Sequence, residues 1–163
     1  MAVYEPALPP GVWPEQQRAA VGDTVARVGE LAAAGKLTHA ARAWAEFVFH
    51  DGEVAALESA GYLEATGRYV PVLLNDIQQG SQPGGPTAAD PEILGRISAP
   101  VLVLHGPDTV NPLFTACARH VADHAPNARV HEIPGAGHAA PLTHPEALAE
   151  ALTEFFSPAQ QPA

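Results

Sequence analysis

Three side chains that can act as acid or base lie where apolar segments of the sequence end. Glu5 follows a short apolar run, Asp108 comes shortly after the apolar run 101–104, and His138 follows a second segment of strand character. In open parallel sheets, reactive groups gather in the loops at the carboxyl ends of the strands. The sequence therefore predicts an acid–base site that joins an imidazole to a carboxylate.

Among the eight histidines, His138 is the best candidate for a functional residue because it lies in a glycine-rich turn. Gly135 and Gly137 relieve the backbone there and let the imidazole project without a bulky neighbour. An imidazole in such a place can take a proton from a nucleophile and return it to a leaving group. The other histidines fit surface or structural positions without a convincing metal-ligand spacing, so we expect no metal site. No other feature of the sequence implies an organic cofactor, and none is expected.

The elements that must position these groups alternate between helix and strand from residue 92 onward. In order, the patterns predict a helix at 92–97, a strand at 100–104, a helix at 111–125, a strand at 128–133 and a helix that starts at a capping box of Thr143 and Glu146. The continuous apolar run 100–104 is typical of a strand buried on both faces. This order predicts an α/β fold with a short parallel sheet of two or three strands flanked by helices.

The first half of the chain has a different character, because helical periodicity dominates after a very short strand at 2–4. Helical patterns cover roughly 14–34, 40–48, 51–59 and 66–78. The glycine- and proline-rich stretch 80–86 marks the best internal boundary. We therefore expect a core strand and exit loop at 1–9, a helical insertion at 10–85, an α/β core at 86–158 and a frayed tail at 159–163.

Together these segments resemble the C-terminal part of the α/β-hydrolase fold. The motifs are Pro-Val-Leu-Val-Leu-His-Gly at 100–106, Ile-Pro-Gly-Ala-Gly-His at 133–138, Thr-His-Pro-Glu-Ala-Leu at 143–148 and Ala-Val-Tyr-Glu-Pro at 2–6. The last of these resembles the strand that precedes the family's helical cap, so that 10–85 would be the cap. The resemblance implies a hydrolase that acts on ester-like or related bonds through a nucleophile–histidine–acid triad, with His138 as its base.

Two carboxylates stay open as the acid of this triad. Most family members place an aspartate three residues after the glycine of the strand at 100–106, where this chain has Thr109, and Asp108 comes one residue early. Some members use an acid after the preceding strand instead, and Glu5 stands in that place. A triad is defined by the roles of its groups rather than by sequence position. Glu5 is favoured, with Asp108 as the alternative.

The nucleophile of the family has no counterpart in this sequence. Family members carry it in a G-x-S-x-G turn or a variant of it, and none of the four serines has glycines at that spacing. The single cysteine, Cys117, falls on the apolar stripe of a helix and is expected to be a buried thiol rather than a nucleophile. The isolated chain is therefore expected to be inactive. It is also expected to self-associate or to pair with a missing N-terminal half, because one sheet edge would be unpaired.

The composition and net charge of the chain indicate which kinds of molecule it can bind. The formal net charge is −10 and Lys36 is the only lysine beside seven arginines, so a basic surface for nucleic acid is not expected. No apolar run reaches membrane-spanning length and no signal segment follows Met1, so the expected location is the cytoplasm. A small apolar or ester-like substrate is expected, held by aromatic residues of the helical insertion. The alternative is a non-catalytic truncated remnant or interaction module.

Overall fold

The computed structural model describes residues 1–80 and 85–157. Within them, three strands form one parallel sheet in the order β1 (Ala2–Tyr4), β2 (Val101–His105), β3 (Ala128–Glu132). The helices are a 3-10 turn at Pro10–Val12, α1 (Glu15–Ala33), α2 (Leu37–Val48), α3 (Asp51–Ser59), α4 (Tyr62–Gly67), α5 (Val70–Gly80), α6 (Pro91–Leu94), α7 (Pro112–His124), α8 (Ala140–Thr143) and α9 (Pro145–Phe156). The predicted α/β fold, with a short parallel sheet flanked by helices, is confirmed.

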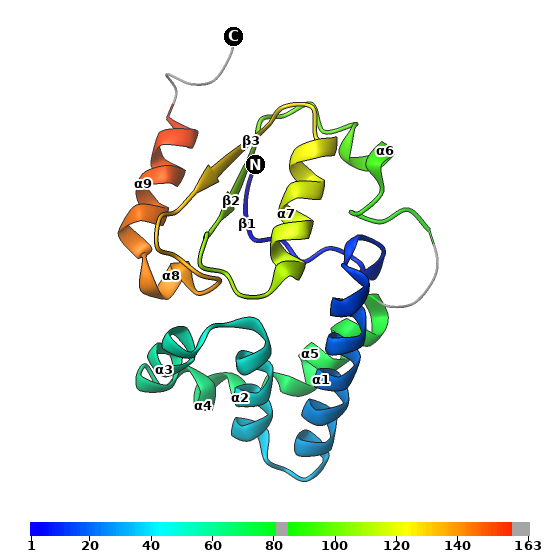
Figure 1. The fold of residues 1–163 in the computed structure, drawn as a ribbon, viewed down its shortest axis with the longest axis vertical. Coiled ribbons are helices and arrows are strands. Elements are labelled where there is room, and N and C mark those ends of the chain that lie inside the picture. Colours follow the sequence, from blue (N-terminus) through cyan, green and yellow to red (C-terminus); the bar gives the residue numbers. More distant parts are fainter. Residues whose placement is uncertain (81–84, 158–163) are drawn as a thin grey trace.

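The central strand β2 is buried on both faces, and its alternating side chains contribute to two separate cores. Val101 and Val103 pack with the apolar face of α7, whereas Leu102 and Leu104 pack with α9 around Phe155. Figure 1 shows α7 and α9 on opposite sides of the sheet. Successive side chains of a strand point to opposite faces, so a strand covered on both sides needs the unbroken apolar run that β2 has.

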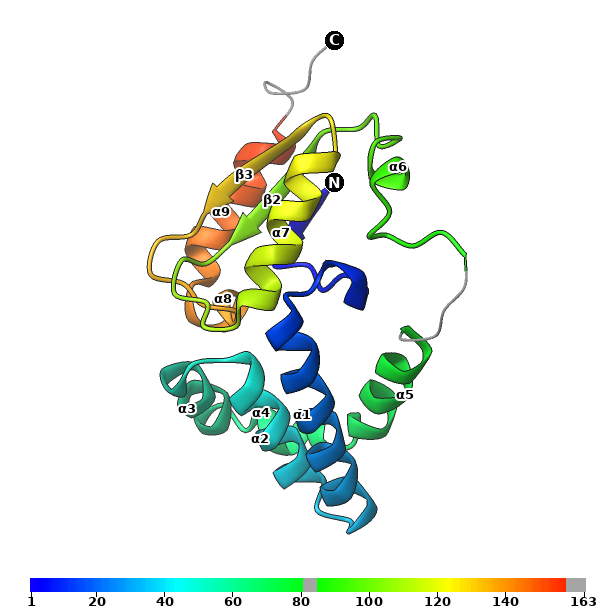
Figure 2. The same ribbon diagram turned by 45° about the vertical axis from the view of Figure 1, so that its right-hand side comes forward.

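Helices α1 to α5 form a second layer beyond the carboxyl ends of the strands (Figure 1). Val28 of α1 and Ala40 of α2 are fully buried at the centre of this layer. The turned view shows the chain returning past α6 to the sheet (Figure 2). Within the described residues, every helix is too short or too polar to cross a membrane. Residues 81–84 of the predicted loop and the predicted tail 159–163 lie outside the described residues.

The helical pattern predicted at 66–78 is divided in the structure between α4 and α5. The break falls at Arg68 and Tyr69, so the first part of the pattern belongs to a helix that starts earlier, at Tyr62. Pro71 then stands in the first turn of α5, where a backbone N–H has no partner within the helix and its loss costs little. Proline therefore begins this helix rather than interrupting it.

The capping box predicted at Thr143 and Glu146 is wrong. Helix α9 begins at Pro145 with His144 as its N-cap, and no side chain caps it. The hydroxyl of Thr143 instead donates to the carbonyl oxygen of Ala139 at 3.2 Å, at the end of α8. Thr143 is the last residue of the short helix α8, so the last helix, α9, begins after it, at Pro145.

Candidate functional site

Glu5 is the first residue after β1, and its backbone turns there. Its φ of 41° lies in the left-handed region, which non-glycine residues rarely adopt and which costs about 1–3 kcal/mol. Its backbone N–H still donates to the carbonyl of Leu104 at 2.9 Å, so the pairing with β2 continues to this residue. Its side chain is 1% exposed. The structure thus holds a carboxylate, in an unfavourable backbone conformation, at the carboxyl end of the sheet.

The buried carboxylate of Glu5 contacts three hydrogen-bonding groups. The backbone N–H of Gly106 donates to Oε1 at 2.9 Å, and the hydroxyl of Thr109 donates to the same oxygen at 2.5 Å. Nδ1 of His138 lies 2.6 Å from Oε2. An ionised carboxylate only accepts hydrogen bonds, so Nδ1 carries the proton and Nε2 of a neutral ring keeps a lone pair. Two strand ends and the glycine turn therefore meet at one carboxylate.

Asp108, the other carboxylate named from the sequence, lies at the surface. Its side chain is exposed, and its backbone N–H donates to the carbonyl of Ala136 at 3.0 Å. Thr109 occupies the place where most α/β-hydrolases have an aspartate, and here its hydroxyl binds Glu5. The geometry therefore brings Glu5 rather than Asp108 to the imidazole.

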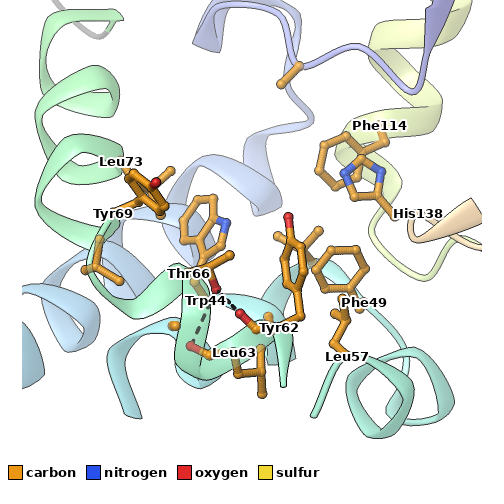
Figure 3. A pocket seen from close by; sticks show the side chains of 15 residues that line it. Trp44, Phe49, Leu57, Tyr62, Leu63, Thr66, Tyr69, Leu73, Phe114 and His138 are labelled. Atoms are coloured by element: carbon orange, nitrogen blue, oxygen red, sulfur yellow. Dashed lines mark hydrogen bonds between the residues drawn. The ribbon is translucent and has the colours of Figure 1, made fainter. Parts of the chain in front are cut away.

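Two aromatic rings hold the plane of the His138 imidazole. Phe114 of α7 stacks on it with ring centroids 3.7 Å apart and planes inclined by 20°. Phe49, which follows α2, contacts it at a tilt with centroids 5.5 Å apart. Figure 3 shows the imidazole beside both rings. One ring comes from the sheet layer and the other from the helical layer, so His138 lies at their boundary.

The turn that carries His138 needs its two glycines for different reasons. Gly135 has a φ of 74°, which disfavours any side chain. The φ of Gly137 is not in that region, but a Cβ there would lie 2.6 Å from the carboxylate of Glu53. The hydroxyl of Tyr4 donates to the carbonyl of Gly137 at 2.5 Å. Burial, and then the nearby Glu5 and Glu53 carboxylates, raise the pKa of Tyr4, so its hydroxyl remains a donor.

Glu53 also belongs to the site, although no sequence pattern predicts it. It lies in the first turn of α3, is 1% exposed, and accepts the backbone N–H of Ala139 at 2.7 Å. An acid in the first turn of a helix is normally explained by the helix dipole. The sequence around it therefore carried no signal of a contact with a turn 86 positions away.

His138 opens onto a largely apolar cavity of about 380 Å³ between the two layers. Its larger lining side chains, drawn in Figure 3, are Trp44, Phe49, Leu57, Tyr62, Leu63, Thr66, Tyr69, Leu73, Phe114 and His138. Of the described residues that line it, none is a lysine, arginine, aspartate or glutamate. The helical insertion predicted at 10–85 contributes four of its aromatic side chains to this lining: Trp44, Phe49, Tyr62 and Tyr69. Two others lie elsewhere, since Trp13 binds the carbonyl of Leu8 and Phe47 packs against Trp44.

The sequence also bears on the thiol of Cys117 and on metal binding. Cys117 is completely buried in α7, as expected, and desolvation raises its thiol pKa. Within residues 1–80 and 85–157, no group of three or more histidine, cysteine or acidic side chains is arranged to hold a metal ion.

Comparison with protein families gives a match to the model described as the alpha/beta hydrolase family over residues 2–151. A candidate non-heme bromoperoxidase, BpoC of Mycobacterium tuberculosis, is 44% identical over 63 residues, which are 38% of this chain and 23% of that protein.

Solved structures are similar over nearly all of this chain. An alpha/beta hydrolase from Sphaerobacter thermophilus superposes with a TM-score of 0.60 and 26% identity, covering 96% of this chain and 57% of that one. The crystal structure of BpoC from Mycobacterium tuberculosis gives a TM-score of 0.55 and 25% identity, covering 95% and 56%. The chain thus spans little more than half the length of the solved structures that it matches.

Proposed function

The chain belongs to the α/β-hydrolase family, and on that premise we propose that it supplies the histidine and the acid of a nucleophile–His–acid triad. The triad would hydrolyse ester-like or related bonds. His138 would act as the general base and Glu5 as the acid that orients it. The observation that carries this proposal is the 2.6 Å contact between Nδ1 of His138 and Oε2 of Glu5.

The geometry supports a definite division of roles. With its Nδ1 proton held by Glu5, the imidazole has Nε2 free to take a proton from an attacking nucleophile and to return it to the leaving group. Within residues 1–80 and 85–157, Nε2 of His138 has no hydrogen-bond partner. The buried charge of Glu5 would stabilise the imidazolium that forms during this transfer.

The nucleophile would come from residues outside this sequence. The nucleophile turn expected for the family has no counterpart among the serines or at Cys117, whose thiol is buried in α7. The solved relatives are longer than this chain, which covers 57% or less of the two described above. We propose that the missing group is contributed by an N-terminal half, either in one longer polypeptide or as a separate chain.

The cavity beside His138 indicates the kind of substrate. Its lining is apolar and aromatic and carries no formal charge, so the group bound there would be an uncharged apolar part of an ester-like molecule. A cavity of about 380 Å³ suits a small molecule rather than a polymer. A charged acyl group would lose its hydration there without a partner, which is costly.

An ester-hydrolysis assay tests the proposal. The chain alone would be compared with a polypeptide extended by the coding sequence upstream of it, using nitrophenyl esters of short and medium acyl length. We expect activity in the extended form and background rates in the short one. In the extended form, His138→Ala should lower kcat/KM by roughly 10³-fold or more.

His131→Ala is the matched control, since His131 is an exposed residue of β3. Its rate should remain close to that of the unmodified protein. Equal activity of the His138→Ala variant would overturn the assignment. Absence of hydrolysis in both forms would favour the non-catalytic alternative.

A further inference from the structure

The buried carboxylate of Glu53 has no role in the triad described above. It comes from α3, in the helical layer, and reaches the turn of His138 in the sheet layer. Oε1 accepts the backbone N–H of Ala139 at 2.7 Å. Oε2 is buried and has no hydrogen-bond partner among the described residues, and Nε2 of His50 lies 3.8 Å from it.

Burial makes Glu53 an expensive way to satisfy one backbone N–H. Taking a carboxylate out of water is costly unless hydrogen bonds or an opposite charge compensate it. Here one oxygen has a strong partner, and the half-buried imidazole of His50 lies 3.8 Å from the other. Residues that are kept at such a cost are typical of functional sites.

Glu53 also packs closely against the turn. The carboxylate fills the space next to Gly137, so that a Cβ at that position would lie 2.6 to 2.7 Å from its atoms. From the sheet side, the hydroxyl of Tyr4 binds the carbonyl of the same glycine. Residues 137 and 139, on either side of His138, are therefore bound from two different layers.

We propose that Glu53 is a positioning residue that holds the turn of His138 from the helical layer. Through the N–H of Ala139 and the space beside Gly137, it fixes the backbone that carries the imidazole, and so the approach of Nδ1 to Glu5. The position of α3 is thereby coupled to the orientation of His138. The meaning of this coupling for catalysis rests on the proposed function, but the coupling itself is testable on this chain alone.

Hydrogen exchange and the proton spectrum of the imidazole provide the test without any substrate. Glu53→Ala should speed exchange of the Ala139 amide by about tenfold or more relative to the Val103 amide of β2, because a buried donor loses its acceptor. The downfield signal of the Nδ1 proton of His138 should broaden or vanish. Glu53→Gln keeps a carbonyl acceptor and should leave both readouts within about twofold.

Glu58→Ala is the matched control, because Glu58 lies on the same helix but is exposed and binds Arg42. It should change neither readout. A general loss of stability would raise exchange of the Ala139 and Val103 amides together, whereas the proposal requires a selective change at Ala139.

Gly137→Ala tests the same contact if Glu53→Ala does not fold. The added methyl displaces the carboxylate without removing a polar group, so the Ala139 amide should again exchange at least about tenfold faster. Unchanged exchange at Ala139 in these variants, with the Nδ1 signal retained, would overturn the proposal. Because no activity is measured, this result is independent of whether the chain contributes to ester hydrolysis.

Discussion

The carboxylate of Glu5 stays in a buried position because donors surround it, and Thr109 is the side chain that completes the set. Its hydroxyl lies 2.5 Å from Oε1, beside the N–H of Gly106 on the same oxygen. A position that holds an aspartate in most of the family here supplies a donor to an acid from another strand. Under the proposed function, the site would therefore be arranged around Glu5 and would not lack an acid.

Thr109→Val should lower the free energy of unfolding by about 2 kcal/mol, because a buried charged acceptor loses a hydrogen bond while the side-chain shape is kept. Urea denaturation measures the effect. Thr109→Ser keeps the hydroxyl and serves as the control, with a smaller loss expected. Equal midpoints for the valine and serine variants would show that the hydroxyl does not stabilise Glu5.

Cys117 should react slowly with a thiol reagent in the folded protein. Burial raises its pKa, so at a given pH less of it is thiolate than of a free cysteine, and the thiolate is the reactive form. Labelling of Cys117 with a chromogenic disulfide reagent at mildly alkaline pH should be slow for the folded chain in buffer and fast for the unfolded chain in urea. Rapid labelling of the folded chain would instead make Cys117 a candidate nucleophile.

Among the elements, α7 connects the sheet to the imidazole through Phe114. This residue is buried and stacks on His138, while the same helix face packs against Val101 and Val103 of β2. The helix therefore supports the site as well as the core. Its N-cap, Asn111, is buried too, and its side chain binds the carbonyl of Phe47 at 3.0 Å. One helix start thus contacts both layers.

Phe114→Ala should cost about 3–5 kcal/mol of unfolding free energy, because a large buried ring is removed and a cavity is left. Phe156→Ala, at a ring that is 53% exposed at the end of α9, is the control and should cost much less. Chemical or thermal denaturation compares the two. Similar losses of unfolding free energy in the two variants would show that the Phe114 ring contributes no more to stability than an exposed ring.

The sequence predicts these elements unevenly, for physical reasons. The strand β2 and the glycine turn of His138 are predicted because each has a strong local signal, an apolar run and a glycine pattern. The choice between Glu5 and Asp108 depends on how distant loops meet, which no local pattern contains. Glu53 was missed for the same reason.

Considered as a whole, the molecule presents β1 at one edge of its sheet. Within the described residues, β1 pairs with β2 on one side, and no strand pairs with its other side. An unpaired strand edge is a template for association with another chain. Val3 and its neighbours in β1 are only partly buried, which adds apolar surface to this edge.

The chain should therefore self-associate at micromolar concentration or bind a complementary half of the fold. Analytical ultracentrifugation over a concentration series measures the first outcome, and an increase in the fluorescence of a hydrophobic dye reports the exposed surface. A monodisperse monomer that does not bind the dye would contradict this expectation.

A comparison of two substitutions in the upstream-extended form shows which carboxylate orients His138. Glu5→Gln removes the charge at Nδ1 of His138, and kcat/KM for an ester should fall by roughly 10²–10⁴-fold. Asp108→Asn, at an exposed carboxylate, should leave kcat/KM within about threefold of the unmodified value. The opposite pattern, with Glu5→Gln active and Asp108→Asn inactive, would show that Asp108 rather than Glu5 is the acid.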